Sequence, residues 1–301
     1  MTDSAIQSLT PQWVAGHLAP RPARAHKGDF GRLLVVAGST EYPGAAVLTA
    51  LGAMRAGAGM VRVAVAGSVA GWLAGVVPEL TWMVLDEESQ GLIAPSGWRR
   101  LTTEASAHDA VVIGPGLGRQ PAMQRRARNL VASLRVPAVI DADGLNALAD
   151  GGTWWTAVRA PLVLTPHPGE FGRLVNAEPP PSDDDAARAS AALEAALRWQ
   201  QVVVLKGANT VVAGPEGDLL RSDVSSPALA TAGTGDVLAG MIGAFLAGGL
   251  PPIEAAGVGV AVHGFAGLLA GERIGTAGAM ARDVATLVPE AMDALRGGRG
   301  R

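Results

Sequence analysis

The chain has 301 residues, a formal net charge of −3, and 49% apolar but only 17% charged and 4% aromatic residues. The small negative charge gives no reason to expect nucleic acid or an anionic membrane as a partner, and the absence of cysteine excludes a disulfide framework and a thiolate metal site. The N-terminus lacks the pattern of a secretory signal, and the longest apolar run, Val237–Leu250, is too short to span a membrane. We therefore expect a cytoplasmic protein.

The chain is long enough for one large domain or two smaller ones, but no linker and no internal repeat divides it. Residues 1–25 are polar and contain prolines, so we expect an N-terminal arm. A single domain is predicted over 26–295. The glycines and arginines of 296–301 predict a flexible tail. The proline-rich stretch Glu178–Pro181 is predicted to be a loop within the domain.

Short β-branched runs alternate with helical segments along the chain. The predicted strands are, in chain order, Arg32–Ala37, Met60–Val65, Thr81–Leu85, Asp109–Ile113, Ala138–Ile140, Leu162–Leu164, Val202–Leu205 and the hairpin of Thr210–Ala213 with Leu219–Arg221. The predicted helices are Ala45–Ala56, Ser68–Val77, Pro121–Leu134, Gly144–Ala149, a segment after Pro168, a helix capped by Ser182 that reaches Trp199, and 236–247, 253–270 and 282–295. This alternation predicts an α/β fold with a mostly parallel central sheet and helices on both faces.

Glycine-rich or polar motifs follow most of the predicted strands. In parallel sheets ligands bind beyond the carboxyl ends of the strands, so these motifs are expected to gather along one edge. Tyr42–Ala46 opens the first long helix and is suited to holding a phosphate at its N-terminus. Gly114–Gly118 either lets a ligand approach the backbone or is an ordinary turn. Asp141 and Asp143 either hold magnesium or a ribose, or Asp143 caps the next helix.

Two further motifs follow the predicted strands Leu162–Leu164 and Val202–Leu205. His167 stands between two prolines, which hold its backbone and so favour a functional role at a strand end. Glu170 either favours the first turn of the next helix or reaches a magnesium ion through water. Lys206 follows a buried strand and offers a point charge for phosphate, although a lysine that extends from the sheet to solvent would look the same.

The most informative stretch is Gly233-Thr234-Gly235-Asp236, directly before an apolar helix. The glycines permit strained backbone angles, and a helix N-terminus offers free N–H groups and a positive dipole end to an anion. An aspartate there is a common helix cap, but a cap does not explain the preceding Gly-Thr-Gly. A carboxylate beside an anion site repels the anion unless it takes part in the chemistry. The stretch lacks the third glycine of a dinucleotide fingerprint.

Together these segments resemble the ADP/ATP-dependent NAD(P)H-hydrate dehydratase family, whose fold is ribokinase-like. The matching pieces, in family order over about residues 26–290, are GRLLVVAGSTEYPGA, VVIGPGLGR, VIDADGLNAL, LTPHPGEFGRL, VLKGANTVVAGPEG and ATAGTGDVLAGMIGAFLAGG. The combination of PHPGE, KGA-x-T and GTGDVL is far more specific than any one piece. Fused members carry an additional epimerase domain, which we do not find, so a stand-alone dehydratase is expected.

The resemblance implies a repair reaction in which hydrated NADH or NADPH is restored at the expense of ADP or ATP, with Mg²⁺. The ring hydroxyl is phosphorylated and phosphate is then lost. The implied catalytic group is Asp236 as base, with the N–H groups of Gly233, Thr234 and Gly235 at the transferring phosphoryl. The implied contacts to the hydrated dinucleotide are Ala45, Gly116, His167 and Asp236, with Gly118 as the alternative to Gly116. The implied nucleotide contacts are Lys206, Gly207, Ala208, Asn209, Thr210 and Gly235.

PHPGE also resembles the Asn-x-x-Glu element of ribokinase-like kinases, which favours Glu170 as an indirect magnesium partner. The sequence departs from the family in Ser225–Ala232, where an asparagine and a glycine are missing, and in Asn209, where a small or basic residue is common. Related proteins suggest a homo-oligomer, with a tetramer as one option. The alternatives are a ribokinase-like small-molecule kinase, for a vitamin precursor or sugar, and a nucleotide-binding sensor without catalysis.

Overall fold

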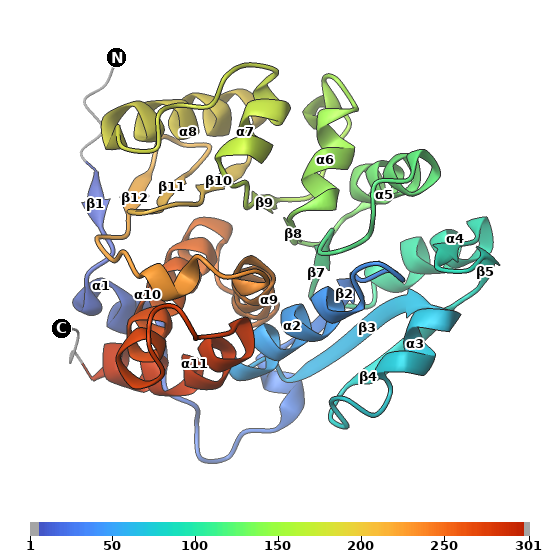
Figure 1. The fold of residues 1–301 in the computed structure, drawn as a ribbon, viewed down its shortest axis with the longest axis horizontal. Helices are drawn as coiled ribbons and strands as arrows, with labels where there is room; N and C mark the ends of the chain where they lie inside the picture. The colour runs from blue at the N-terminus through green and yellow to red at the C-terminus, as the bar shows by residue number, and fades with distance from the viewer. Residues whose placement is uncertain (1–5, 298–301) are drawn as a thin grey trace.

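A ten-stranded sheet crosses the whole molecule in the computed structural model, which describes residues 6–297 (Figure 1). The strands are β1 Gln7–Ser8, β2 Arg32–Val36, β3 Met60–Ala66, β4 Thr81–Leu85, β7 Ala110–Ile113, β8 Ala138–Ile140, β9 Leu162–Leu164, β10 Val202–Leu205, β11 Val211–Ala213 and β12 Leu219–Arg221, with a separate pair of β5 Glu87–Ser89 and β6 Leu92–Ile93. The order across the large sheet is β1-β12-β11-β10-β9-β8-β7-β2-β3-β4. From β4 to β10 all neighbours are parallel, and β10, β11 and β12 pair antiparallel.

Helices cover both faces of this sheet, with α5 to α8 on one side and α2, α9, α10 and α11 on the other (Figure 1). The helices are α1 Pro11–His17, α2 Pro43–Arg55, α3 Gly67–Leu73, α4 Pro95–Ala105, α5 Pro121–Ser133, α6 Asp143–Ala149, α7 Pro168–Val175, α8 Asp185–Trp199, α9 Thr234–Ala247, α10 Pro252–Arg273 and α11 Ala281–Arg296. The central strands β2, β7, β8, β9 and β10 are apolar and almost wholly buried, as expected for strands covered on both faces. The predicted α/β fold is confirmed.

The N-terminal part of the chain differs from the expected arm. Gln7 and Ser8 extend the sheet beside β12, and Val14 of α1 is fully buried. This strand was not predicted, because two residues are too few to show strand periodicity. Helix α4 and the β5–β6 pair were also not predicted. The α8 cap is Asp184, which accepts from the N–H of Ala187, and not Ser182. Most of the predicted tail lies outside the described residues.

Glycines let α2 and α9 cross backbone to backbone. A Cβ on Gly52 would lie 2.2 Å from the carbonyl oxygen of Val237, and one on Gly240 would lie 1.9 Å from that of Thr49. Neither position can hold a side chain without separating the helices. The close crossing packs the first turns of α9 against the second half of α2.

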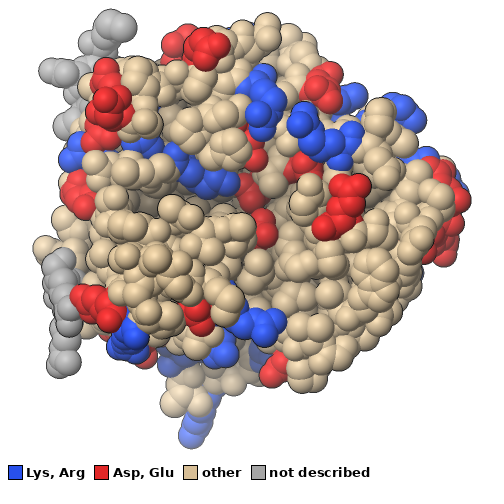
Figure 2. All heavy atoms as spheres, viewed as in Figure 1, with Lys and Arg blue, Asp and Glu red and all other residues tan. Residues whose placement is uncertain are grey.

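Among residues 6–297 one helix, α10, is long and apolar enough to cross a membrane, with a mean hydropathy of 1.6. However, 83% of its apolar window is buried inside the protein, as in the core helix of a globular domain. Helix α10 is longer than Val237–Leu250, which was expected from the sequence to be the longest apolar run. Figure 2 shows that acidic and basic side chains are interspersed on the face that is viewed.

Candidate active site

The Gly-Thr-Gly-Asp stretch forms the N-terminus of α9, as predicted. Gly233 is the N-cap residue with φ +90°, and a Cβ there would lie 2.5 Å from Cδ1 of Leu48, so glycine is required. The hydroxyl of Thr234 lies 2.8 Å and 2.9 Å from the carbonyl oxygens of Leu229 and Thr231, and so fastens the turn. The N–H of Thr234 also donates to Thr231 (3.3 Å). Of the three N–H groups expected to face an anion, those of Gly233 and Gly235 have no protein partner within residues 6–297.

Asp236 lies in the first turn of α9, where its carboxylate is largely withdrawn from water. Burial and the negative charge of Asp141 raise the pKa of Asp236 to about 7, and the positive charge of Lys206 opposes this rise. A carboxyl group with a pKa near the ambient pH is suited to accept a proton as a general base. This shift marks Asp236 as a candidate for chemistry at neutral pH.

Lys206 links two carboxylates, one that follows β8 and one that follows β9. Its Nζ lies 2.8 Å from Oδ1 of Asp141 and 3.9 Å from Oε2 of Glu170. The hydroxyl of Thr165 donates to the same oxygen of Asp141 at 2.7 Å. Burial lowers the pKa of Lys206, but Asp141 and Glu170 more than offset this and raise it, so the ammonium stays charged. A Cβ on Gly235 would lie only 3.4 Å from Nζ, so this ammonium also borders the glycine turn.

His167 and Glu170 form a capping box at the N-terminus of α7. The N–H of His167 donates to Oε2 of Glu170 (2.9 Å), and Nδ1 of His167 accepts from the N–H of Gly169 (3.1 Å). Burial, Lys206 and Arg173 lower the pKa of His167, so the ring is neutral at pH 7. Because Nδ1 accepts a hydrogen bond, the proton of the neutral ring lies on Nε2. Nε2 lies 3.4 Å from Oε1 of Glu170, and about half of the His167 side chain is exposed, so a bound molecule can compete with Glu170 for this donor.

Gly116 and Ala45 meet at the edge of the same site. Gly116 has φ +62°, and a Cβ there would lie 2.7 Å from Cβ of Ala45 and 2.8 Å from Cβ of Tyr42. The N–H of Gly118 is occupied, because it donates to Oδ2 of Asp143 (2.8 Å). This favours Gly116 over Gly118 as a free backbone contact. It also gives Asp143 a structural role, although Ala142 and not Asp143 is the N-cap of α6.

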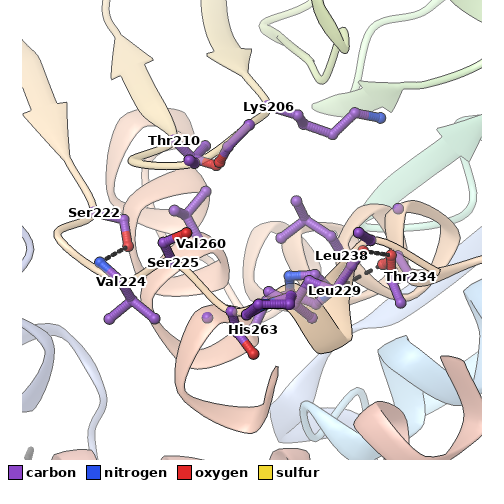
Figure 3. Close-up of a pocket in the computed structure, with 17 residues that line it drawn as sticks. Lys206, Thr210, Ser222, Val224, Ser225, Leu229, Thr234, Leu238, Val260 and His263 are labelled. Atoms are coloured by element: carbon purple, nitrogen blue, oxygen red, sulfur yellow. Dashed lines mark hydrogen bonds between the residues drawn. The ribbon is translucent and has the colours of Figure 1, made fainter. Parts of the chain in front are cut away.

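A cavity of about 350 Å³ lies beside the glycine turn, between the loop after β10 and helices α9 and α10. Lys206, Gly207, Ala208 and Thr210 line it from the loop after β10, and Gly235 lines it from α9. Asn209, which the resemblance placed among these contacts, does not line the cavity. Figure 3 shows Lys206 above the cavity and Leu229, Val260 and His263 below it.

His263 of α10 was not identified from the sequence, where a single histidine in an apolar run gave no signal. Its Nε2 lies 2.9 Å from the carbonyl oxygen of Thr234, and its ring lines the cavity. Burial lowers the pKa of His263 to about 4, and the Thr234 carbonyl only partly opposes this. The ring is therefore neutral and donates to the glycine turn.

The atypical segment Ser225–Ala232 is held in place by bonds of its own. The hydroxyl of Ser226, which stands where the family has asparagine, donates to the carbonyl of Gly267 (2.9 Å). Leu229 packs on the same glycine, where a Cβ would lie 2.5 Å from its Cγ. The hydroxyl of Thr231 donates to Ala279 (3.2 Å). The segment is thus anchored to α10 despite its departure from the family.

Magnesium would find few direct protein ligands here. Within residues 6–297 no group of three or more His, Asp or Glu side chains could hold a metal ion. Oε2 of Glu170 is occupied by the N–H of His167, and Lys206 and the ring of His167 lie beside the carboxylate. Mg²⁺ usually keeps several waters and binds substrate phosphates with one or two carboxylates. The residues therefore fit an ion that arrives with nucleotide phosphates and meets Glu170 through water.

Comparisons with known proteins match the chain to one family of enzymes. The family model for NAD(P)H-hydrate dehydratase matches residues 33–290. The ADP-dependent (S)-NAD(P)H-hydrate dehydratase of Xanthomonas campestris is 39% identical over 299 residues, which are 98% of this chain and 99% of that protein. The chain spans about half (53%) of the length of bifunctional NAD(P)H-hydrate repair enzymes that it matches at 39–41% identity.

Solved structures share the fold. The crystal structure of the ADP/ATP-dependent NAD(P)H-hydrate dehydratase from Bacillus subtilis, co-crystallised with ATP and Mg²⁺, has a TM-score of 0.81 and 31% identity, and the match covers 98% of this chain and 100% of that one. A ribokinase-like superfamily protein from Enterococcus faecalis has a TM-score of 0.80 at 24% identity, covers 96% of each chain, and shows the fold alone. The predicted ribokinase-like architecture is confirmed.

Proposed function

The chain belongs to the NAD(P)H-hydrate dehydratase family, and we propose that it dehydrates the 6S form of hydrated NADH or NADPH back to NADH or NADPH at the expense of ADP or ATP. The observation that carries the proposal is the position of Asp236. A carboxyl group with a pKa of about 7 stands beside unpaired N–H groups and the Lys206 ammonium. This arrangement provides a base for a hydroxyl group and positive charge for a phosphoryl group in one place.

The reaction proceeds in two steps. Asp236 takes the proton of the ring hydroxyl as that oxygen attacks the terminal phosphoryl group of the nucleotide, the phosphoanhydride bond breaks, and AMP leaves from ADP, or ADP from ATP. The N–H groups of Gly233 and Gly235 stabilise the charge on the transferring phosphoryl oxygens. The carbon–oxygen bond of the phosphorylated ring then breaks, phosphate leaves with the bonding electrons, and loss of a proton from the neighbouring carbon restores the double bond.

The remaining residues bind the two substrates. Ala45, Gly116 and His167 contact the hydrated dinucleotide, with Gly116 offering backbone and His167 a donor at Nε2. Lys206, the loop to Thr210 and Gly235 bind the nucleotide in the adjoining cavity. When bound, Mg²⁺ neutralises phosphate charge, and Glu170 would hold it through water. We further propose a cytoplasmic homo-oligomer, whose mass in solution can be measured by light scattering.

The test is a direct assay of the purified protein with hydrated NADH, Mg²⁺ and either ADP or ATP. Recovery of the absorbance of reduced nicotinamide is expected, and its absence with both nucleotides would refute the proposal. Asp236→Asn should abolish turnover while nucleotide binding persists. Release of a stable phosphorylated product would instead identify a small-molecule kinase, and ligand-induced stabilisation without turnover would identify a sensor.

A further inference from the structure

A buried arginine lies directly behind the loop that follows β10. Arg188 of α8 is 1% exposed. Its Nη1 donates to the carbonyl oxygen of Ala208 (2.5 Å), and its Nη2 lies 3.3 Å and 3.4 Å from those of Leu205 and Lys206. The side chain of Asp185, one turn earlier on α8, accepts from Nη1 at 3.2 Å. A buried guanidinium is stable only when its donors are paired in this way.

These bonds decide which way the peptide groups of the loop face. Arg188 takes the carbonyls of Lys206 and Ala208, and the hydroxyl of Thr210 donates to the carbonyl of Gly207 (2.9 Å). No peptide bond of the described chain is cis, so each N–H points opposite to the preceding carbonyl. The N–H groups of Gly207 and Asn209 therefore face away from Arg188, and that of Ala208 points opposite to the carbonyl that Thr210 holds. None of them has a protein partner within residues 6–297.

Two further residues fit the same arrangement. Gly207 has φ +149°, and a Cβ there would lie 2.7 Å from Nη2 of Arg188, so only glycine lets the guanidinium approach. Asn209 has the left-handed φ of +52°, and its Nδ2 donates to Oδ2 of Asp185 at 2.8 Å. Asp185 thus holds both Arg188 and Asn209. This gives Asn209 a structural role in place of the direct contact that the resemblance implied.

We propose that Arg188 is a positioning residue for nucleotide binding. It holds the carbonyl groups of Lys206 and Ala208 toward α8 and so leaves the N–H groups of Gly207 and Ala208, which line the cavity, free to meet a phosphate of the nucleotide. Successive N–H groups of this kind form anion-binding concavities. Arginine suits the position because its planar group reaches several acceptors at once and keeps its charge. The inference rests on the proposed use of ADP or ATP.

The experiment compares the wild type with Arg188→Met, Arg188→Lys and, as matched control, Arg198→Met, which changes an exposed arginine of the same helix. Calorimetric titration with ADP and ATP measures binding without turnover, and steady-state assays separate the KM values of the two substrates. Arg188→Met should weaken nucleotide binding at least about tenfold, because the hydrogen bonds from the charged guanidinium to the loop carbonyls are lost. Arg188→Lys should fall between it and the wild type. The KM for hydrated NADH should change by less than about twofold.

A purely structural role for Arg188 would lower the unfolding temperature and leave the nucleotide dissociation constant, measured well below that temperature, unchanged; that result would overturn the inference. If Arg188→Met does not fold, Arg188→Lys and Gly207→Ala decide the question. In these variants the KM for the nucleotide should rise relative to the KM for hydrated NADH. A wild type that binds neither ADP nor ATP would refute the nucleotide-dependent function itself. If the wild type and the Arg188 variants bind ADP and ATP equally well, only the role of Arg188 is refuted.

Discussion

Replacing Asp236 with asparagine should stabilise the folded protein, and the gain should grow with pH. The folded environment raises the pKa of Asp236 from 3.8 to about 7, chiefly by burial and secondly through Asp141. Between these two values the folded chain binds more protons than the unfolded chain. The raised pKa therefore costs no stability below pH 3.8, and stability falls as the pH rises toward 7. Asparagine keeps the shape of the side chain without the charge.

The size of the effect follows from the shift of about three pKa units. Each unit corresponds to 1.36 kcal/mol, so the ionised carboxylate costs at most about 4 kcal/mol above pH 7. At pH 5 little more than one unit has been titrated, and the cost is about 2 kcal/mol. The stability gain of the variant over the wild type should therefore be roughly 2 to 3 kcal/mol larger at pH 8 than at pH 5. Expressed as unfolding temperature, the gain should be larger by about 5 °C or more at pH 8.

Thermal or denaturant unfolding of both proteins at pH 5 and pH 8, without ligands, measures this difference. Asp183→Asn, at an exposed aspartate of the loop before α8, controls for a general change of net charge. If the stability gain of Asp236→Asn is independent of pH, or if the variant is less stable than the wild type at pH 8, the raised pKa of Asp236 is refuted. Lost turnover with increased stability would be the trade-off expected of a base held in an unfavourable environment.

Two further predictions concern activity. As Asp236 must be ionised to act as base, kcat/KM should rise with pH to half its maximum near pH 7. In rate profiles at saturating substrates, Lys206→Met should move this midpoint to higher pH, because Lys206 lowers the pKa of Asp236. Asp143→Asn should move it to lower pH, because Asp143 raises that pKa. Shifts of the same sign in the two variants would contradict this. Gly116→Ala, whose Cβ would lie 2.7 Å from that of Ala45 at φ +62°, should raise the KM for hydrated NADH about tenfold or more with little effect on nucleotide binding, and an unchanged KM would exclude Gly116 from the substrate site.

Local sequence patterns were sufficient for most of the sheet and its helices. Runs such as Arg32–Ala37 and Val202–Leu205 are apolar and β-branched because they are buried on both faces, and this composition is visible without coordinates. Segments whose structure depends on distant partners were not visible. Gln7–Ser8 forms a strand only because β12 offers it a partner, and α4 carries several polar residues that conceal its single buried face.

The sequence by itself determined that a glycine turn and a carboxylate stand at a helix N-terminus, because both are local properties of consecutive residues. It also determined which strand ends carry polar groups. Only the tertiary structure decided how these groups act on one another. Lys206 and Asp236 set each other's charge because β10 and α9 bring them together, and Arg188 lies behind the nucleotide loop because α8 packs on β10. Electrostatic and hydrogen-bond effects depend on distance in space, which the order of residues does not contain.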